Sequence, residues 1–392
     1  MRVLFTHQPG FGHLHPMVPL ARALEEAGHE VAFACVPTFC PTIEATGFRC
    51  FPVGASETDE EMKQFRARQA KLPFEEWAGY MWVHSFAGFR AERSLPDTLD
   101  LARTWQPDLI VRDLTEFSGY LVAESLGLPH ATMQLAAYRP ELQRLVSEPL
   151  IRLRKSIGLP PEQDVDSLHR YLMLSPRPHS FQDPASPLPP TAHAIRHGGF
   201  NASADEHLPK WVDDLPDRPT IYATLGTVFN NLTDIFVAIL EGLRDEPVNL
   251  ILTVGRNFDP ATFGPQPPSV HIERYVPQSL LLPHCDVVIT HAGSGTVMDA
   301  LSHGLPMVTI PIAADQWPNA QSCARLGVAR VISPDQRTPE AIREATLDVL
   351  QNPSYKQHAE QIRAEMDALP DWDYAVKLLE RLAVEKAPLL PE

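Results

Sequence analysis

The chain has 392 residues, a length that predicts two or three domains, and 44% of its residues are hydrophobic while 21% are charged. This composition excludes disordered, collagenous and coiled-coil proteins and predicts a sizeable packed core. Lys and Arg number 33 against 49 Asp and Glu, so the formal net charge is −16. Such an acidic balance argues against a general electrostatic hold on nucleic acid or on an anionic membrane.

The cysteines and the apolar runs bear on the compartment in which the protein works. Five cysteines stand at scattered positions without a Cys-x-x-Cys pair, which indicates neither a disulfide framework nor a zinc ribbon. The apolar run near Met1 is too short for a signal-peptide core, and no run approaches the ~20 apolar residues that a membrane helix needs. We therefore expect a soluble cytoplasmic protein.

The first half of the chain alternates short apolar strands with helical patterns. An apolar run at 2–6 is followed by a glycine-containing loop, a helical pattern that Gly28 ends, and a buried strand at 31–35. The theme recurs with a strand at 108–112 and a helical stretch at 114–126. This alternation predicts a parallel sheet with helices on its faces.

The second half repeats the alternation. Its strands are expected at 220–224, 249–254, 287–290 and 307–311, and its first helix at 232–243. Two such halves in one chain predict two doubly wound α/β domains in tandem.

Two stretches differ in composition from these alternating strands and helices. Nine of the 39 prolines lie within the 44 residues 176–219, which favours extended, stiff chain and places the domain boundary there, around 200–218. The stretch 65–89 is rich in aromatic residues. It is either a helical insertion packed on its own core or a lining for an apolar ligand.

The densest chemical signal lies after the strand at 287–290. The sequence His291-Ala292-Gly293-Ser294-Gly295-Thr296 is a glycine-rich turn that opens a helix, and its backbone N–H groups and helix dipole suit a phosphate, although such turns also occur for steric reasons. Asp315-Gln316 follows the next strand at the carboxyl edge, where open α/β sheets bind ligands. A carboxylate beside an amide matches the vicinal hydroxyls of a sugar, with a solvated loop pair as the alternative.

Together these segments resemble the nucleotide-sugar signature of the family 1 glycosyltransferases, the UDP-glycosyltransferase superfamily with the GT-B fold. That signature reads Trp-x-Pro-Gln, His-x-Gly-x-x-Ser, a carboxylate and Asp-Gln. Here it reads Tyr275-Val276-Pro277-Gln278, His291-x-Gly293-x-x-Thr296, Asp299 and Asp315-Gln316, over about 45 residues with the spacing kept. The Gly295-Thr296 form is similar to bacterial natural-product members.

The resemblance implies which residues hold the donor, from the base and ribose through the diphosphate to the hexose hydroxyls. They are Gly12, Thr224, Gly226, Thr227, Tyr275, Val276, Gln278, His291, Gly293, Ser294, Gly295, Thr296, Asp299, Asp315 and Gln316. Tyr275 stands where the family has Trp, and Asp299 where it has the longer Glu, so UDP and TDP both remain candidates. Asp315-Gln316 favours a fully hydroxylated hexose such as glucose, because a deoxysugar would leave these polar groups unpaired; a TDP-deoxysugar is the alternative.

The N-terminal half fits the family's Gly-His-x-x-Pro motif at 12–16, which implies that His13 is the catalytic base. Imidazole titrates near neutrality, so it can take a proton from an attacking alcohol or phenol. The resemblance also implies that Asp113 orients His13, while a helix N-cap is the alternative role for this aspartate. An apolar natural product is the implied acceptor, with contacts expected from Trp77, Met81, Phe86 and Glu116.

The resemblance implies an α/β GT-B fold, with two Rossmann-like doubly wound parallel-sheet domains facing across a cleft. Residues 1–205 would bind the acceptor, with a proline-rich linker at about 176–218. Residues 219–370 would bind the nucleotide sugar, and 371–392 would form a helix crossing back to the first domain. The implied enzyme is an inverting, metal-independent hexosyltransferase of antibiotic-type biosynthesis. It would act as a monomer or homodimer and need no cofactor besides its UDP- or TDP-sugar co-substrate.

Other functions fit the sequence less well. His13-x-His15 with Asp113 lacks further ligands for a metal hydrolase, and Gly10-Phe11-Gly12 lacks the third glycine of a nicotinamide dehydrogenase. An NDP-sugar epimerase of the same fold and a catalytically silent NDP-sugar-binding partner of another transferase remain as alternatives.

Overall fold

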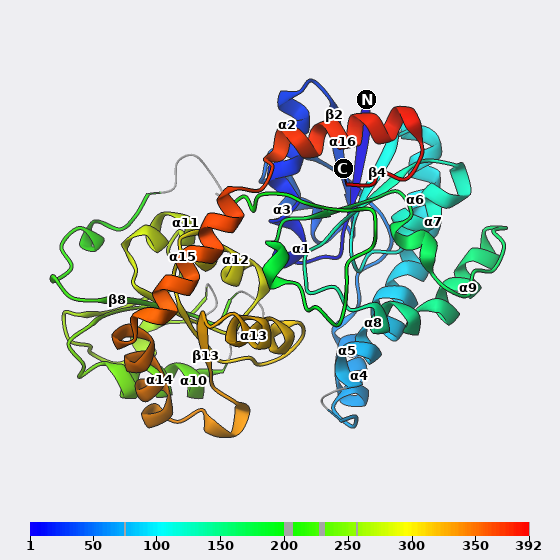
Figure 1. Ribbon diagram of the computed structural model, residues 1–392. Helices are drawn as coiled ribbons and strands as arrows, with labels where there is room; N and C mark the ends of the chain where they lie inside the picture. Colours follow the sequence, from blue (N-terminus) through cyan, green and yellow to red (C-terminus); the bar gives the residue numbers. More distant parts are fainter. Residues whose placement is uncertain (74–75, 200–206, 227–231, 256–257, 392) are drawn as a thin grey trace. The chain divides into compact units, whose positions relative to one another are not determined.

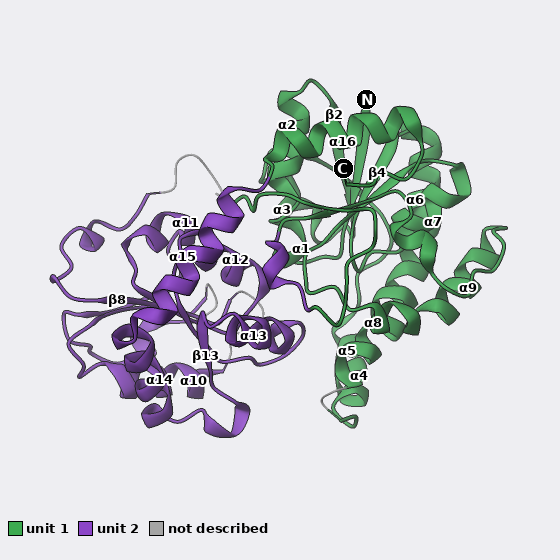
Figure 2. Ribbon diagram, in the orientation of Figure 1, with its two compact units in different colours: residues 1–176, 184–198, 370–392 green, residues 177–183, 199–369 purple. Residues whose placement is uncertain are grey.

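The described part of the computed structural model comprises residues 1–73, 76–199, 207–226, 232–255 and 258–391. The chain divides into two compact units (Figure 2). Unit 1 holds residues 1–176, 184–198 and 370–392, and unit 2 holds residues 177–183 and 199–369. Part of the expected linker, Arg177–Asp183, therefore belongs to unit 2, and the C-terminal residues belong to unit 1.

Unit 1 is built on a seven-stranded parallel sheet in the order β3-β2-β1-β4-β5-β6-β7 (Figure 1). Its strands are β1 (Arg2–Thr6), β2 (Glu30–Cys35), β3 (Arg49–Pro52), β4 (Leu109–Asp113), β5 (His130–Met133), β6 (Leu172–Ser175) and β7 (Ala192–Ala194). The strand order reverses between β1 and β4. At such a switch point the loops after the two strands separate, and open α/β sheets bind their ligands there.

Helices cover both faces of the unit 1 sheet. They are α1 (Phe11–Leu14), α2 (Val18–Glu26), α3 (Cys40–Glu44), α4 (Asp59–Gln69), α5 (Trp77–Tyr80), η2 (Met81–Arg90, π-helical), α6 (Ala91–Trp105), α7 (Ser118–Leu126), α8 (Pro140–Leu145), α9 (Ser147–Ser156), η3 (Asp166–His169) and α16 (Trp372–Glu385). Leu4 and Ile110 pack against α6 and α7. The last helix, α16, lies along α2 (Figure 1), and His29 Nε2 bonds the Glu380 carboxylate at 2.9 Å between them.

Unit 2 carries a six-stranded parallel sheet in the order β10-β9-β8-β11-β12-β13. The strands are β8 (Thr220–Thr224), β9 (Asn249–Thr253), β10 (Val270–Glu273), β11 (Val287–Thr290), β12 (Met307–Thr309) and β13 (Ala329–Val331). The helices are η4 (His179–Phe181), η5 (Lys210–Val212), α10 (Thr233–Leu243), η6 (Pro260–Phe263), α11 (Gln278–Leu281), η7 (Leu282–His284), α12 (Ser294–Ser302), α13 (Gln316–Arg325), η8 (Pro334–Gln336), α14 (Pro339–Gln351) and α15 (Pro353–Asp367).

The four inner strands of unit 2, β8, β9, β11 and β12, are buried and largely apolar because helices cover both faces of the sheet. Ile221 and Ala223 pack with α10 and α14, whereas Tyr222 between them packs with α12, α13 and α15. The prediction of two doubly wound parallel α/β domains is confirmed. The strands expected at 2–6, 220–224 and 287–290 form at those bounds.

Two local expectations differ from the structure. The helical stretch expected at 114–126 begins only at Ser118, because Leu114 to Phe117 form the loop that follows β4. Cys40 and Cys50 are joined by a disulfide, which the scattered cysteine spacing did not indicate. The other three cysteines are buried thiols.

No helix among the described residues is long and apolar enough to cross a membrane. Within the same residues, no group of three or more His, Cys, Asp or Glu side chains is arranged to hold a metal ion.

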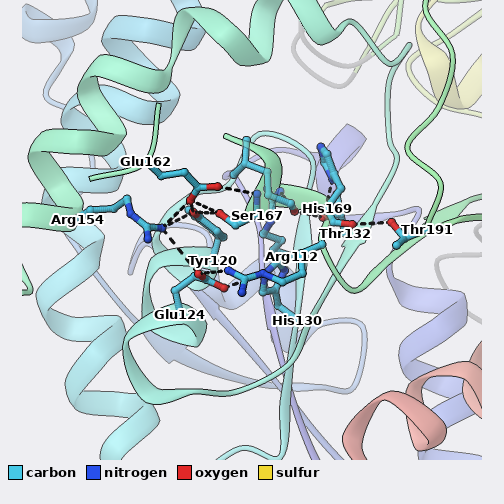
Figure 3. Close-up of polar contacts among 12 residues, drawn as sticks. Arg112, Tyr120, Glu124, His130, Thr132, Arg154, Glu162, Ser167, His169 and Thr191 are labelled. Atoms are coloured by element: carbon cyan, nitrogen blue, oxygen red, sulfur yellow. Dashed lines mark hydrogen bonds and ion pairs between the residues drawn. The ribbon is translucent and has the colours of Figure 1, made fainter. Parts of the chain in front are cut away.

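Figure 3 shows a buried group of side chains that we call the polar cluster of unit 1, which comprises Arg112, Tyr120, Glu124, His130, Thr132, Arg154, Glu162, Ser167, His169 and Thr191. Arg112 on β4 donates to the carbonyl oxygens of Glu116 and Leu168, each at 2.9 Å. Arg154 on α9 donates to the Tyr120 hydroxyl at 2.6 Å and lies 3.1 Å from the Glu162 carboxylate. The cluster thereby ties α7, α9 and η3 to the strand that ends in Asp113.

Burial keeps two histidines of this cluster neutral. It lowers the pKa of His130, against the opposing influence of the Glu124 carboxylate. It also holds the pKa of His169 well below its usual value, with the charge of Arg112 acting in the same direction. The His130 ring meets the rings of Tyr120 and Tyr171 edge-on, at centroid distances of 5.5 and 5.3 Å. In the folded state His130 is packed as an aromatic side chain.

We expect the free energy of unfolding to fall as the pH drops below about 6.5, the ordinary pKa of histidine. The folded pKa values of these histidines are lowered, so the unfolded chain binds more protons in this range, and stability is lost with falling pH. Each histidine that stays neutral contributes a slope of about 1.4 kcal/mol per pH unit. His130→Phe keeps the aromatic packing and removes one such group, so its thermal unfolding midpoint should depend less steeply on pH.

Calorimetry between about pH 5.5 and 6.5 measures this slope at least one pH unit above the ordinary carboxyl pKa values of about 3.9 and 4.3. His284→Gln is the control, because His284 is exposed and should keep the wild-type slope. An unaltered slope in His130→Phe would contradict the assignment of a neutral buried imidazole.

Candidate active site

A histidine and an aspartate from two loops of unit 1 form a hydrogen-bonded pair. His13 lies in the short helix α1 beyond the end of β1, and Asp113 is the last residue of β4. Because β1 and β4 are parallel neighbours, with Thr6 opposite Arg112, both loops leave the sheet at the same edge. The Nδ1 atom of His13 lies 3.0 Å from Oδ2 of Asp113. The structure thus brings together the two residues expected to be catalytic.

The Asp113 carboxylate is 0% exposed and is surrounded by donors. It accepts from the backbone N–H of Gln8 at 2.7 Å, and from the backbone N–H and hydroxyl of Thr115 at 2.5 and 2.7 Å. Burial opposes its charge, but the charge and hydrogen bond of His13 and the other donors bring the pKa of Asp113 well below its usual range. The ionised carboxylate accepts from Nδ1–H of His13, which leaves Nε2 as the proton-accepting atom.

Glu116, expected to contact the acceptor, has its carboxylate engaged within unit 1. One oxygen accepts from the Ser118 hydroxyl and, at 2.6 Å, from the Ser118 backbone N–H. The other accepts from the Thr6 hydroxyl at 2.6 Å and the Gly119 N–H at 2.9 Å. Glu116 therefore holds the first turn of α7 against β1. Asp113 does not cap this helix, and an acceptor contact of Glu116 stays a prediction.

The aromatic stretch 65–89 divides between two environments. Phe65 packs against Tyr80 and Phe89, with ring centroids 5.1 and 5.9 Å apart, as an insertion with its own core would. Trp82 instead joins the main core of unit 1. Phe86 is half-buried and lies edge-on to the His13 ring at 6.4 Å. Of the expected acceptor residues, Phe86 is thus beside the histidine.

Trp77 and Met81, the other expected acceptor contacts, are half-buried at the start of the same helical stretch. The indole N–H of Trp77 donates to the carbonyl oxygen of Leu72 at 3.2 Å. Their contact with an acceptor stays a prediction.

In unit 2 the glycine turn is shaped around the buried imidazole of His291. A Cβ atom on Gly226 would lie 2.6 Å from Cε1 of this ring, and a Cβ on Gly293 would lie 2.5 Å from Nε2. Gly226 also has a φ of 74°, which favours glycine. Burial lowers the pKa of His291 to about 4, so the ring is neutral at physiological pH. Both glycines are needed for close approach to the histidine.

The loop after β12 is held by side chains of α13. Gln316 is buried, and its Oε1 accepts from the backbone N–H groups of Ile312 and Ala313 at 2.7 and 2.8 Å. Oδ2 of Asp315 accepts from the amide of Asn319 at 2.8 Å. The same Asn319 amide donates to the carbonyl oxygen of Ala292 at 3.0 Å. Asn319 therefore joins the glycine turn to the Asp315-Gln316 loop.

The residues expected to bind the base and ribose differ in how exposed they are and in their contacts. The amide of Gln278 donates to Oδ2 of Asp299 at 2.6 Å, so the structure brings these two together. Tyr275 is 45% exposed. The Val276 side chain packs in the core of unit 2, so only its main chain remains to contact a base.

The remaining expected donor residues lie at the ends of strands and helices. Gly12 directly precedes His13 in α1, and Gly295 and Thr296 follow Ser294 in the first turn of α12. Thr224 ends β8, and its hydroxyl accepts from the Gly226 N–H at 3.2 Å. Thr227 lies outside the described residues.

Sequence reasoning missed two residues of this site. Asn319 stands four residues after Asp315, a helical spacing that could have pointed to it. Arg177 lies in the proline-rich stretch, yet it donates to the Ser294 hydroxyl in the glycine turn. No sequence signal marked Arg177.

Two doubly wound parallel α/β units in one chain are the architecture of the GT-B glycosyltransferases. Comparison with protein families agrees with this class. Residues 22–226 match the N-terminal domain, and residues 239–382 the C-terminal domain, of the family described as erythromycin biosynthesis protein CIII-like. The chain belongs to this family of bacterial natural-product glycosyltransferases.

Individual relatives extend over nearly the whole chain. It is 29% identical to the aclacinomycin-T 2-deoxy-L-fucose transferase of Streptomyces galilaeus, with 98% of this chain and 97% of the relative covered. The 10-deoxymethynolide desosaminyltransferase of Streptomyces venezuelae is also 29% identical, with 98% of each chain covered. The crystal structure of the glycosyltransferase VinC in complex with dTDP is similar with a TM-score of 0.78. Its identity is 28%, over 98% of this chain and 100% of VinC.

We expect Gly226→Ala to weaken nucleoside diphosphate binding by at least tenfold, because the new methyl group would displace the His291 ring from the glycine turn. Gly127→Ala is a control for backbone strain: Gly127 has a φ of 64° and no atom within 4 Å of its Cβ position. Both variants should lose about 1 kcal/mol of stability through backbone strain. Only Gly226→Ala should lose affinity for TDP and UDP in calorimetric titrations, and equal affinities in the two variants would contradict this prediction.

Proposed function

We propose that this protein is an inverting glycosyltransferase that moves a hexose from a UDP- or TDP-sugar to a hydroxyl group of an apolar natural product. The observation that carries the proposal is the 3.0 Å bond between Nδ1 of His13 and the buried Asp113 carboxylate. The His13 side chain is 29% exposed, so an acceptor can reach it. A base with one nitrogen fixed and the other accessible suits proton removal from an alcohol.

In the proposed reaction Nε2 of His13 takes the proton of the acceptor hydroxyl while its oxygen attacks the anomeric carbon of the donor. The bond from that carbon to the diphosphate breaks, and its electron pair leaves with the diphosphate oxygen. Attack from the opposite face inverts an α-linked sugar to a β-glycoside. The Asp113 carboxylate stabilises the imidazolium that forms.

In this proposal, residues of unit 2 stabilise the negative charge that develops on the leaving diphosphate. The backbone N–H groups at the first turn of α12 and its helix dipole favour an anion there. The neutral His291 adds a hydrogen-bonding ring beside them. The proposal includes no metal ion, and the donor sugar is a co-substrate.

Two observations favour a TDP-deoxysugar over the glucose donor that the sequence suggested. Oε1 of Gln316 is held by two backbone N–H groups, and Oδ2 of Asp315 by Asn319, so fewer acceptor atoms remain for sugar hydroxyls. The relatives named above include a 2-deoxy-L-fucose transferase and a desosaminyltransferase. The crystal structure of VinC is that of its complex with dTDP. A panel of TDP- and UDP-hexoses tests this choice, and exclusive turnover of UDP-glucose would contradict it.

The acceptor is proposed to be an apolar cyclic scaffold that carries an alcohol or phenol. Phe86 lies beside His13, and Trp77 and Met81 belong to the same helical stretch. Aromatic and thioether side chains suit a flat or polycyclic apolar ligand.

We expect His13→Ala to lower kcat about 10²- to 10⁴-fold while donor affinity is unchanged, because only proton removal from the acceptor is lost. Asp113→Asn should lower kcat in the same direction, since the amide no longer stabilises the imidazolium. His29→Ala is the control: it removes another histidine paired with a carboxylate, at 2.9 Å from Glu380. His29 directly precedes β2, at the amino ends of the strands, whereas His13 lies beyond the carboxyl end of β1. Near-wild-type turnover in His13→Ala would refute the mechanism.

Product analysis separates the proposal from its alternatives. A transferase releases free nucleoside diphosphate in step with acceptor consumption. An epimerase would convert the donor sugar without releasing diphosphate, and a silent binding partner would do neither. The anomeric configuration of the isolated glycoside, measured by proton NMR coupling, tests inversion.

A further inference from the structure

Arg177 is a buried cation of unit 2 placed against the glycine turn. Its side chain is 5% exposed. Burial lowers its pKa to about 10, so the guanidinium is charged at neutral pH. Prolines on both sides, Pro176 and Pro178, restrict its backbone to extended conformations.

The segment that carries Arg177 is clamped onto unit 2 by polar contacts. The Glu365 carboxylate on α15 accepts from the backbone N–H and hydroxyl of Ser180 at 3.0 and 2.5 Å. Arg325 on α13 donates to the carbonyl oxygens of 180–182 at 3.0 to 3.3 Å. The Phe181 ring lies 5.2 Å from the Arg177 guanidinium carbon. These contacts fix the position from which Arg177 reaches the turn.

The Arg177 guanidinium joins two parts of the expected donor site. Nη2 donates to the Ser294 hydroxyl, in the first turn of α12, and lies 3.5 Å from Oδ1 of Asn319. The amide of Asn319 donates in turn to Asp315 and to the carbonyl oxygen of Ala292. One cation therefore connects the glycine turn, through Asn319, with the loop that carries Asp315.

The charge of Arg177 has no ion-pair partner among the described residues. A charge removed from water costs free energy unless an opposite charge or strong hydrogen bonds compensate it. Asp315 is the acidic residue whose charge is felt at Arg177, and its Oδ2 bonds Asn319. A dianionic diphosphate at the start of α12 would supply the missing counter-charge.

We infer that Arg177 is a donor-recognition residue with two roles. It positions Ser294 and the Asn319–Asp315 pair, and its positive charge strengthens the binding of the nucleoside diphosphate. This inference rests on the proposed function, since it assigns the diphosphate of the donor to the turn at α12. Arg177 acts through Ser294 and Asn319 and takes no part in proton transfer.

Calorimetric titration of the full chain with TDP, UDP and thymidine tests the inference. Arg177→Met keeps a long side chain without charge and should raise the Kd for both diphosphates about 10- to 100-fold, the effect of losing a charge-assisted contact. The Kd for thymidine, which lacks phosphate, should stay at the wild-type value. Arg177→Lys restores the charge without the planar fork and should recover part of the diphosphate affinity.

Arg325→Met is the matched control, because Arg325 holds the same segment through backbone carbonyls only. Its affinity for TDP should stay closer to wild type than that of Arg177→Met. Wild-type TDP affinity in Arg177→Met, or an equal loss of thymidine and TDP affinity, would overturn the inference. If Arg177→Met fails to fold, Arg177→Lys decides in its place: it must bind TDP more weakly than wild type with thymidine affinity unchanged.

These outcomes are distinct from a failure of the proposed function. A wild-type protein that binds neither diphosphate would contradict the proposed function and this inference together. A wild-type protein that binds TDP, while Arg177→Met binds it equally well, would contradict this inference alone.

Discussion

A carboxylate removed from water at the end of β4 organises the reactive edge of unit 1. Burial opposes the charge of Asp113, so it persists only because Gln8, Thr115 and His13 donate hydrogen bonds to it. Gln8 follows β1 and Thr115 follows β4, so satisfying this one charge also fixes the two loops to each other. The orientation of His13 is a consequence of that requirement. Arg112, on the same strand, donates from its two terminal nitrogens to carbonyl oxygens and fixes the loop after β4 from within the polar cluster of unit 1.

The glycine turn of unit 2 depends on a different constraint, the room around a buried side chain. The imidazole of His291 fits where a Cβ atom on Gly226 or on Gly293 would lie within 2.6 Å of the ring. Asn319 and Arg177 then connect this turn with the loop after β12. The edge of unit 1 is thus organised around a buried negative charge, whereas the turn of unit 2 holds a neutral ring and is joined to a cation through Ser294. This difference fits the roles proposed for the two units, proton removal and anion binding.

The features that the sequence predicted well are those that local pattern encodes. Apolar runs such as 220–224 and 287–290 are buried on both faces, so their composition alone marks them as strands, and the motif spacing marked His13 and the glycine turn. Contacts between distant residues carry no such pattern. Arg177 meets Ser294 across 117 positions, and its proline-rich surroundings read as linker. The start of α7 was misjudged because Glu116, three residues beyond the strand end, provides the oxygens that hold its first turn.

The overall charge of the chain makes the local cation consequential. At a formal net charge of −16, the long-range field repels a dianionic nucleotide, so affinity has to come from groups within a few ångströms of the phosphates. Salt screens the distant charges over about 8–10 Å but weakens a buried interaction far less. A helix N-terminus supplies roughly half an elementary charge, whereas a guanidinium supplies a full one. Under the proposed assignment, Arg177 therefore gives this acidic protein a full positive charge beside the helix N-terminus that holds the diphosphate.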